Sequence, residues 1–383
     1  MLKIVFSVLT GKCWVSPGNQ TELSESGWQA QKLRAIVPLW FKALLSSLIV
    51  LTLTSCGKEP LYQEQSYVFG TLVEVSIYGE TEARAKQLTA QVFRDFDTMH
   101  HTLHAWKPGT LSRMNGIFSQ SPSKAAIQPG MIPIIRDATR YYEQSQGLFN
   151  PSIGKLIKLW GFQNDEFVPV RPDPKVIAQL VQANPKLTDI VIENIEFYSK
   201  NPDVKLDLGG YAKGYALDME SAYLRSQGVK GALINIGGNI IAVGKRGGRP
   251  WHVGIQHPRK PGPIATLDLL DGEAIGTSGD YQRYFMLDGK RYCHIIDPRT
   301  GYPAQGIQAV TIITPPGPQA GTLSDVASKP IFIAGEQGWR QAANNMKVRD
   351  VMLINDKGAI FVTHGMKERL TFLDKSGVIR ESE

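Results

Sequence analysis

Cysteine is scarce in this chain of 383 residues, which contains only Cys13, Cys56 and Cys293. No two of them form a C-x-x-C pair, which argues against a thiolate zinc site or a redox dithiol. If Cys13 leaves with a leader and Cys56 is modified, Cys293 stands alone. The fold then has no internal disulfide and depends on burial of a hydrophobic core.

A strong charge bias is also absent. The net charge is +7, and residues 1–56 contribute five cations and two anions, which leaves +4 for the rest of the chain. This mild excess can help to hold an anionic ligand, but it is far from the basic surface of a nucleic-acid-binding protein, so no nucleic acid is expected as a partner. No internal repeat or low-complexity tract is present, and the 37 Gly and 23 Pro follow no period, which excludes a fibrous protein.

Long apolar runs are missing as well. The uncharged stretch at 43–55 has about 13 residues, whereas a membrane-spanning helix needs about 20. Basic residues precede this stretch and Leu53-Thr54-Ser55-Cys56 ends it, which resembles the signal of bacterial lipoproteins, whose cysteine is diacylated. A buried core helix is the alternative.

We therefore expect residues 1–55 to be a signal peptide with an over-long start, and Cys56 to be the lipidation site. The protein would then be lipid-anchored at the periplasmic face of a bacterial membrane. Residue 57 is Gly, and the choice between the inner and the outer membrane stays open.

The remainder is predicted to be a polar tether, residues 56–66, followed by one compact unit over residues 67–383. Strands and helices alternate without a regular βαβ rhythm, which favours the α+β class over a doubly wound sheet. Expected helices cover 81–104, 131–146 and 214–227. Expected strands cover 68–78, 189–198, 232–243, 309–314, 351–354 and 359–363, the last two joined by a hairpin turn.

A glycine turn precedes the third expected helix, in Asp207-Leu208-Gly209-Gly210-Tyr211-Ala212-Lys213. Gly209 and Gly210 allow the backbone to approach a ligand, and a helix N-terminus offers free N–H donors to phosphate. Many turns before helices hold paired glycines, so an ordinary turn is the alternative. The block is neither a Walker loop nor a G-x-G-x-x-G motif.

Polar groups are concentrated between Thr277 and Gly301. Within this segment Asp280, His294, Asp297 and Arg299 can be interpreted as a base, an orienting group and an anion clamp. The structural alternative is that Asp297-Pro298 starts a turn and His294 fills a gap in the core.

Three further blocks have two interpretations each. The glycines of Asn235-Ile236-Gly237-Gly238-Asn239 indicate a bulge within a strand or a nearby ligand. The aromatics around Phe149 and in Leu159-Trp160-Gly161-Phe162 could stack on a flat ring or pack in the core. Asp325 could cap a helix or bind a hard metal ion.

Together these blocks resemble the FAD:protein FMN transferase (ApbE) family, in the family's order, over about residues 67–365. The most specific matches are Thr277–Tyr281, Asp288–Tyr292 and His294–Gly301. The resemblance implies an ApbE-like, T-fold-like unit that transfers FMN from FAD to a Ser or Thr hydroxyl of an acceptor flavoprotein in membrane redox complexes. AMP would leave, and His294 or Asp297 would take the proton.

The resemblance also implies the ligand contacts. Flavin contacts fall on Phe69, Trp106, Leu148, Phe149, Asn150, Asp207, Lys213, His294 and Ile296. A Mg²⁺ ion would take the carbonyl of Gly210 and the carboxylate of Asp325. The third metal position, four residues after Asp325, is Lys329 where the family usually has Thr, and Asn150 stands where the family commonly has Asp.

Lys329 is expected to weaken Mg²⁺ binding, because an ammonium has no lone pair and repels a cation. Its side chain either points away beside Pro330 or pairs with Asp325 and competes with the metal. For the metal shell, either Ser328 or water completes it, or Lys329 itself supplies part of the positive charge. An FAD pyrophosphatase and a non-catalytic flavin-binding lipoprotein are the alternative functions.

Overall fold

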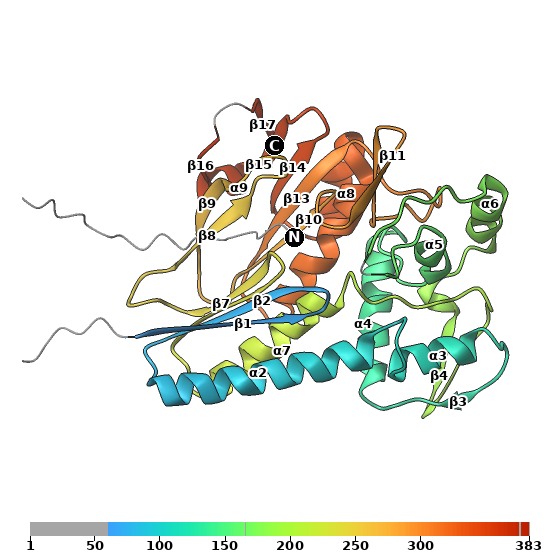
Figure 1. Ribbon diagram of the computed structural model, residues 1–383, viewed down its shortest axis with the longest axis horizontal. Helices are drawn as coiled ribbons and strands as arrows, with labels where there is room; N and C mark the ends of the chain where they lie inside the picture. The colour runs from blue at the N-terminus through green and yellow to red at the C-terminus, as the bar shows by residue number, and fades with distance from the viewer. Residues whose placement is uncertain (1–59, 165, 375–376, 383) are drawn as a thin grey trace, which may run out of the picture. The chain divides into compact units, whose positions relative to one another are not determined.

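A nine-stranded sheet forms the centre of the protein (Figure 1). The computed structural model describes residues 60–164, 166–374 and 377–382. Neighbouring strands are antiparallel except for the last pair. In spatial order they are β1 (Leu61–Val68), β2 (Thr71–Tyr78), β6 (Gly231–Ile236), β7 (Asn239–Gly244), β10 (Ala274–Gly279), β13 (Ile307–Thr314), β14 (Asp350–Asn355), β15 (Ile360–Thr363) and β17 (Ile379–Ser382).

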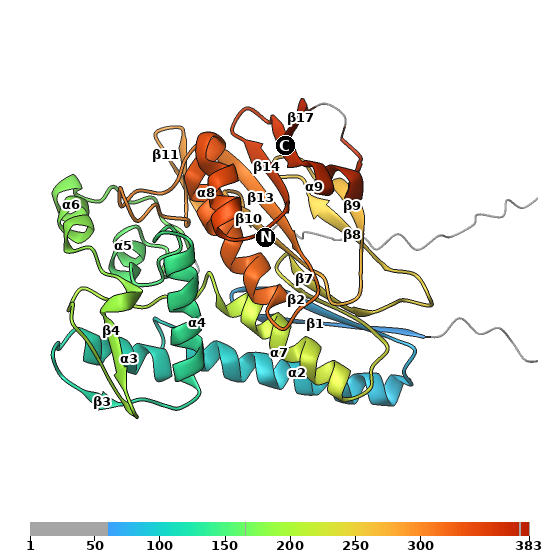
Figure 2. The same ribbon diagram turned by 180° about the vertical axis from the view of Figure 1, so that it is seen from behind.

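Three long helices pack along this sheet: α2 (Glu82–Leu103), α7 (Ala212–Ser226) and α8 (Ala320–Asn345). Helices α2 and α7 lie side by side in both views (Figures 1 and 2). The Thr81 hydroxyl caps α2 by accepting from the Arg84 N–H at 3.4 Å. Leu88, Val92 and Phe96 follow at helical spacing and are buried, so the helix predicted over 81–104 is confirmed.

A small second sheet forms a separate apolar cluster with side chains of the large sheet. It contains β8 (Trp251–Gln256), β9 (Pro263–Leu269) and β16 (Thr371–Phe372), and α9 (His364–Arg369) contacts β14 and β15. Its apolar residues pack with Ile240, Ala309 and Met352 of the large sheet. All eight residues of β13 are buried, as expected for a strand covered on both faces.

The chain between α2 and α7 forms a group of short elements to one side of the sheet, drawn in cyan and green (Figure 1). The hairpin β11 (Tyr284–Leu287) to β12 (Lys290–Cys293) follows β10. The short elements between α2 and α7 are α3 (Thr110–Phe118), β3 (Ala125–Ala126), α4 (Met131–Gln144), α5 (Gly154–Leu159), α6 (Pro174–Ala183), the 3₁₀ turn η1 (Leu187–Asp189), β4 (Ile190–Glu193) and β5 (Glu196–Ser199).

Several predicted boundaries were wrong. Residues 61–66, expected to be tether, belong to edge strand β1, and the predicted strand 68–78 spans the turn between β1 and β2. The segments 189–198 and 232–243 are hairpins rather than single strands. Gly237 and Gly238, expected to mark a bulge or a nearby ligand, form the turn of the second hairpin with φ of 59° and 95°, values that favour glycine.

The predicted lipidation site, Cys56, and the predicted signal peptide lie outside the described residues. Within residues 60–164, 166–374 and 377–382, no helix combines the length and apolar character needed to cross a membrane.

Two glycines bring α7 and α8 together at their first turns. A side chain on Gly321 would stand 2.7 Å from the carbonyl oxygen of Gly214, so only glycine permits this approach. Asp218 of α7 then caps α8, accepting from the N–H groups of Gly321 at 2.7 Å and Thr322 at 2.8 Å. This crossing places the start of α7 beside Asp325.

Candidate functional site

The centre of the site is the buried carboxylate of Asp325 in the second turn of α8. It is 0% exposed, and its Oδ2 accepts from the backbone N–H of Gly214 at 3.0 Å. The Lys213 Nζ of α7 lies 3.8 Å from its Oδ1. The helix crossing thus joins two sequence blocks that are more than a hundred residues apart.

Lys329, in the next turn of α8, forms a charged cluster together with Lys213 and Asp325. Its Nζ donates to Asp325 Oδ1 and, at 2.6 Å, to the Asp325 carbonyl oxygen. Its Cε lies 3.4 Å from the position that a Cβ on Gly210 would take. Of the two orientations expected for Lys329, the structure has the pairing with Asp325.

The carboxylate of this cluster lies near two ammonium groups, which favour its charged form, whereas the charge of Lys213 disfavours that of Lys329. Burial alone would raise the pKa of Asp325, but the charges of Lys213 and Lys329 outweigh it and lower that pKa. Burial lowers the pKa of Lys329 to about 8, although Asp325 acts in the opposite direction. The carboxylate and the Lys329 ammonium are therefore both charged at neutral pH.

The side chains around Asp325 do not supply the ligand atoms that Mg²⁺ requires, which are several oxygens at octahedral positions. Lys329 offers only N–H donors there. The Ser328 hydroxyl, the other expected oxygen, donates to the Asp325 carbonyl at 2.7 Å and lies 2.7 Å from Ser278 Oγ. Among the described residues, no group of three or more His, Cys, Asp or Glu side chains could hold a metal ion.

His294 lies partly buried within the electrostatic reach of the same cluster. Its Nδ1 is 3.3 Å from the carbonyl oxygen of Arg283, which can only accept, so Nδ1 carries the proton and Nε2 keeps its lone pair. Burial and then the charges of Arg283, Lys213 and Lys329 lower the pKa of His294 to about 3. The imidazole is neutral at pH 7 and can accept a proton at Nε2.

Asp297 and Asp280 each form an ion pair with an arginine. The Asp297 carboxylate accepts from the backbone N–H of Arg299 at 2.9 Å and from its guanidinium. Asp280 forms a two-pronged pair with Arg259 at 2.7 and 2.6 Å. Asp297 therefore organises the turn, as in the structural alternative, and the described residues show no hydrogen bond between it and His294.

The expected flavin contacts fall into two groups. Around the glycine turn, Trp106 Nε1 donates to Asp207 Oδ2 at 2.8 Å, Asp207 Oδ1 accepts from the Gly209 N–H at 2.8 Å, and the Phe149 ring lies against Gly210. Leu148 is partly buried beside this part of the core. Phe69, at the β1–β2 turn, is edge-on to Phe96 and His100 and packs against the same core cluster, whereas Ile296 is buried in another cluster.

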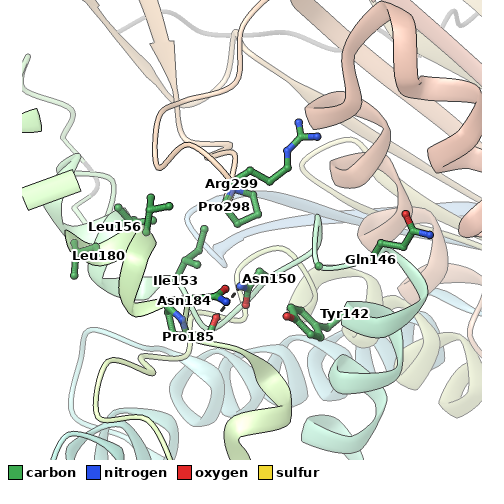
Figure 3. A pocket seen from close by; sticks show the side chains of 12 residues that line it. Tyr142, Gln146, Asn150, Ile153, Leu156, Leu180, Asn184, Pro185, Pro298 and Arg299 are labelled. Carbon is green, nitrogen blue, oxygen red and sulfur yellow. Dashed lines mark hydrogen bonds between the residues drawn. The ribbon is translucent and has the colours of Figure 1, made fainter. Parts of the chain in front are cut away.

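Asn150 borders a pocket of about 150 Å³ (Figure 3). Its side chain donates to the Pro185 carbonyl at 2.9 Å and caps the Ser152 N–H at 3.0 Å. Pro298 and Arg299 line the opposite wall, so the pocket brings together the Asn150 block and the Asp297–Gly301 turn. Trp160, one of the aromatics expected to stack on a ring or pack, is 3% exposed and packs in the core.

Sequence reasoning missed two contributions to this site. Arg283 supplies the carbonyl that fixes the His294 tautomer and also lowers its pKa by its charge. Gly321 permits the helix crossing, and its only sequence signal is a small residue at the start of a helix. Neither residue type points to chemistry by itself.

The fold and site define a class: a mixed α+β unit in which two lysines, one buried carboxylate and a neutral histidine surround a glycine turn. The ApbE family matches residues 69–353, and the chain belongs to this family, as the sequence predicted.

Two proteins similar in sequence to this chain are named FAD:protein FMN transferase. The FAD:protein FMN transferase of Rhodobacter capsulatus is 40% identical over 81% of this chain, which spans 58% of that protein's length. The one of Klebsiella pneumoniae (strain 342) is 31% identical over 79% of this chain and 87% of its own.

Solved structures confirm the expected fold. The ApbE protein of Thermotoga maritima superposes with a TM-score of 0.73 at 28% identity, over 81% of this chain and 99% of that one. The flavin transferase ApbE of Vibrio cholerae gives 0.68 at 26% identity, over 81% and 100%.

Proposed function

We propose that this protein transfers FMN from FAD to a Ser or Thr hydroxyl of an acceptor protein. The acceptor oxygen attacks the FMN-side phosphorus, a new P–O bond forms, the pyrophosphate bond breaks, and AMP leaves. His294 Nε2 takes the hydroxyl proton. The observation that carries this proposal is the neutral His294 beside the Lys213–Asp325–Lys329 cluster, within an ApbE fold.

Positive charge at this cluster suits the FAD pyrophosphate. Lys213 and Lys329 neutralise charge that develops on the leaving AMP, as cations do in phosphoryl transfer generally. Trp106, Phe149 and Asp207 form the flavin side of the site. The family resemblance also implies Mg²⁺, but the donor set does not fit it, so no step is assigned to a metal.

Transfer is tested by incubating the protein with FAD and an acceptor carrying a Ser or Thr motif. We expect FMN to become covalently bound to the acceptor, detected by mass spectrometry of its peptides, with AMP released in equal amount. Free FMN and AMP without labelled acceptor would indicate a pyrophosphatase, and unchanged bound FAD a non-catalytic flavin-binding protein.

The anchor forms a second part of the proposal. Since Cys56 follows Leu53-Thr54-Ser55, we propose lipidation there, a position at the periplasmic face of the membrane, and acceptors in membrane redox complexes. Cys56→Ser is expected to abolish incorporation of labelled lipid and to release the protein from the membrane fraction. Cys293→Ser serves as the control, since this thiol is buried in the core. Retention and labelling of the Cys56 variant would refute the anchor.

A further inference from the structure

The position that the resemblance gives to a metal ion is filled by a side chain of the protein itself. That position lies between Gly210 and the Asp325 carboxylate, and the end of Lys329 lies there: its Cε is near Gly210 and its Nζ donates to Asp325 Oδ1. The Lys329 side chain is 15% exposed. Solvent therefore has little access to the pair, and a metal ion could reach the carboxylate only by displacing the lysine.

The charge around Asp325 is already compensated. One carboxylate faces two ammonium groups, Lys213 and Lys329, and its second oxygen accepts the Gly214 N–H. A divalent cation would bring two further positive charges within a few ångströms of both lysines, in a site where low solvent access strengthens the repulsion. Without Lys329, the buried carboxylate would keep only Lys213, at 3.8 Å, as a counter-charge, and would have room for another cation.

We propose that the Lys329 ammonium is a fixed cation that takes the place of a divalent metal ion, so that the site is complete without Mg²⁺. Lys329 is a positioning and charge-supplying residue in this assignment. The part of the inference that concerns FAD rests on the proposed function, whereas the part that concerns metal binding and folding does not.

The native protein gives the first test, without FAD. After treatment with EDTA and dialysis, its thermal unfolding midpoint is expected to be the same in EDTA and in millimolar Mg²⁺, because a ligand raises stability only if it binds the folded state. Titration with Mn²⁺, followed by electron paramagnetic resonance of the free ion, is expected to show no stoichiometric site. A Mn²⁺ site of micromolar affinity, or a clear rise of the midpoint with Mg²⁺, would overturn the proposal.

Lys329→Thr supplies an oxygen and removes the ammonium. We expect a lower unfolding midpoint in EDTA, recovery with Mg²⁺, and Mn²⁺ affinity increased by about tenfold or more. Lys329→Met removes the charge but offers no oxygen, so its lost stability should not return with Mg²⁺. Lys86→Thr, an exposed site on α2, is the matched control and should resemble the native protein.

A folded Lys329→Thr variant that gains no Mn²⁺ affinity would also refute the proposal, because Lys329 would not be what excludes the metal. FAD affinity, measured by quenching of flavin fluorescence, should be equal in EDTA and Mg²⁺ for the native protein and should require Mg²⁺ in Lys329→Thr. If FAD binds in this pattern but no FMN reaches an acceptor, the transfer function fails and the fixed cation stands. The two failures are thus distinguishable.

Discussion

Replacing His294 by alanine is expected to lower the rate of FMN transfer by about 10²-fold or more while FAD binding is retained. Nδ1 of His294 donates to the Arg283 carbonyl, which leaves Nε2 as the proton acceptor. A general base acts mainly in the transition state, so its removal should lower kcat far more than it weakens FAD affinity. Single-turnover transfer and flavin fluorescence quenching measure the two effects separately.

The pH dependence of the native protein provides a second readout of the same role. Because burial and neighbouring cations lower the pKa of His294 to about 3, the ring is already in its basic form at neutral pH. Protonation of His294 should therefore cause no loss of kcat/KM, which reports the free protein, between about pH 5 and 8. FAD brings negative charge close to Lys213 and Lys329, which should raise the pKa of His294 in the complex.

His252→Ala is the control for this substitution, since His252 is exposed on β8 and pairs with Asp268. It should transfer FMN at the native rate. If His294→Ala instead abolishes FAD binding, His294 is a binding residue. If turnover hardly changes, it is a packing residue, and the assignment of the base is wrong in either case.

The sequence predicted those elements whose apolar periodicity is local. The repeat of Leu88, Val92 and Phe96 shows α2 directly, because burial along one face produces it. Strand β1 could not be found in this way: it is a mostly polar edge strand, and pairing with β2 rather than its own composition determines its conformation.

In the site, too, contacts between residues close in sequence could be predicted, whereas contacts that depend on helix packing could not. Asp325 and Lys329 are four residues apart on one helix, so their pairing was among the alternatives available from sequence. The approach of Lys213 depends on the glycine contact between α7 and α8, which is a property of the packed fold. The pairing of Asp297 with Arg299 joins neighbours two residues apart, but the sequence alone did not decide between a turn and a catalytic role, and the role of Asp297 in proton transfer stays a prediction.

The second large effect expected concerns stability and arises from Glu220 of α7. This side chain is 3% exposed, and among the described residues its Oε2 has no hydrogen-bond partner. Burial and then the charge of Asp95 raise the pKa of Glu220 from 4.5 to about 8. The folded protein therefore keeps a proton on Glu220 that the unfolded chain releases.

The sign of the pH effect follows from this difference. Below about pH 4.5 the folded and the unfolded protein both hold the proton, and the contribution of Glu220 to the free energy of unfolding is then at its highest. As pH rises from 4.5 to about 8 only the unfolded chain ionises, so stability falls by as much as about 5 kcal/mol, at about 1.4 kcal/mol per pH unit. Above pH 8 this contribution is lost in full.

Glu220→Gln removes the titration and keeps the shape, so its free energy of unfolding should decline much less over this range. Urea unfolding at about pH 5, 7 and 9 measures it, and the variant should exceed the native protein most clearly at the highest pH. Glu143→Gln, exposed on α4, is the control and should follow the native curve. Parallel curves for the native and Glu220→Gln proteins would mean that Glu220 ionises as easily in the folded protein as in the unfolded chain, which its burial and the charge of Asp95 argue against.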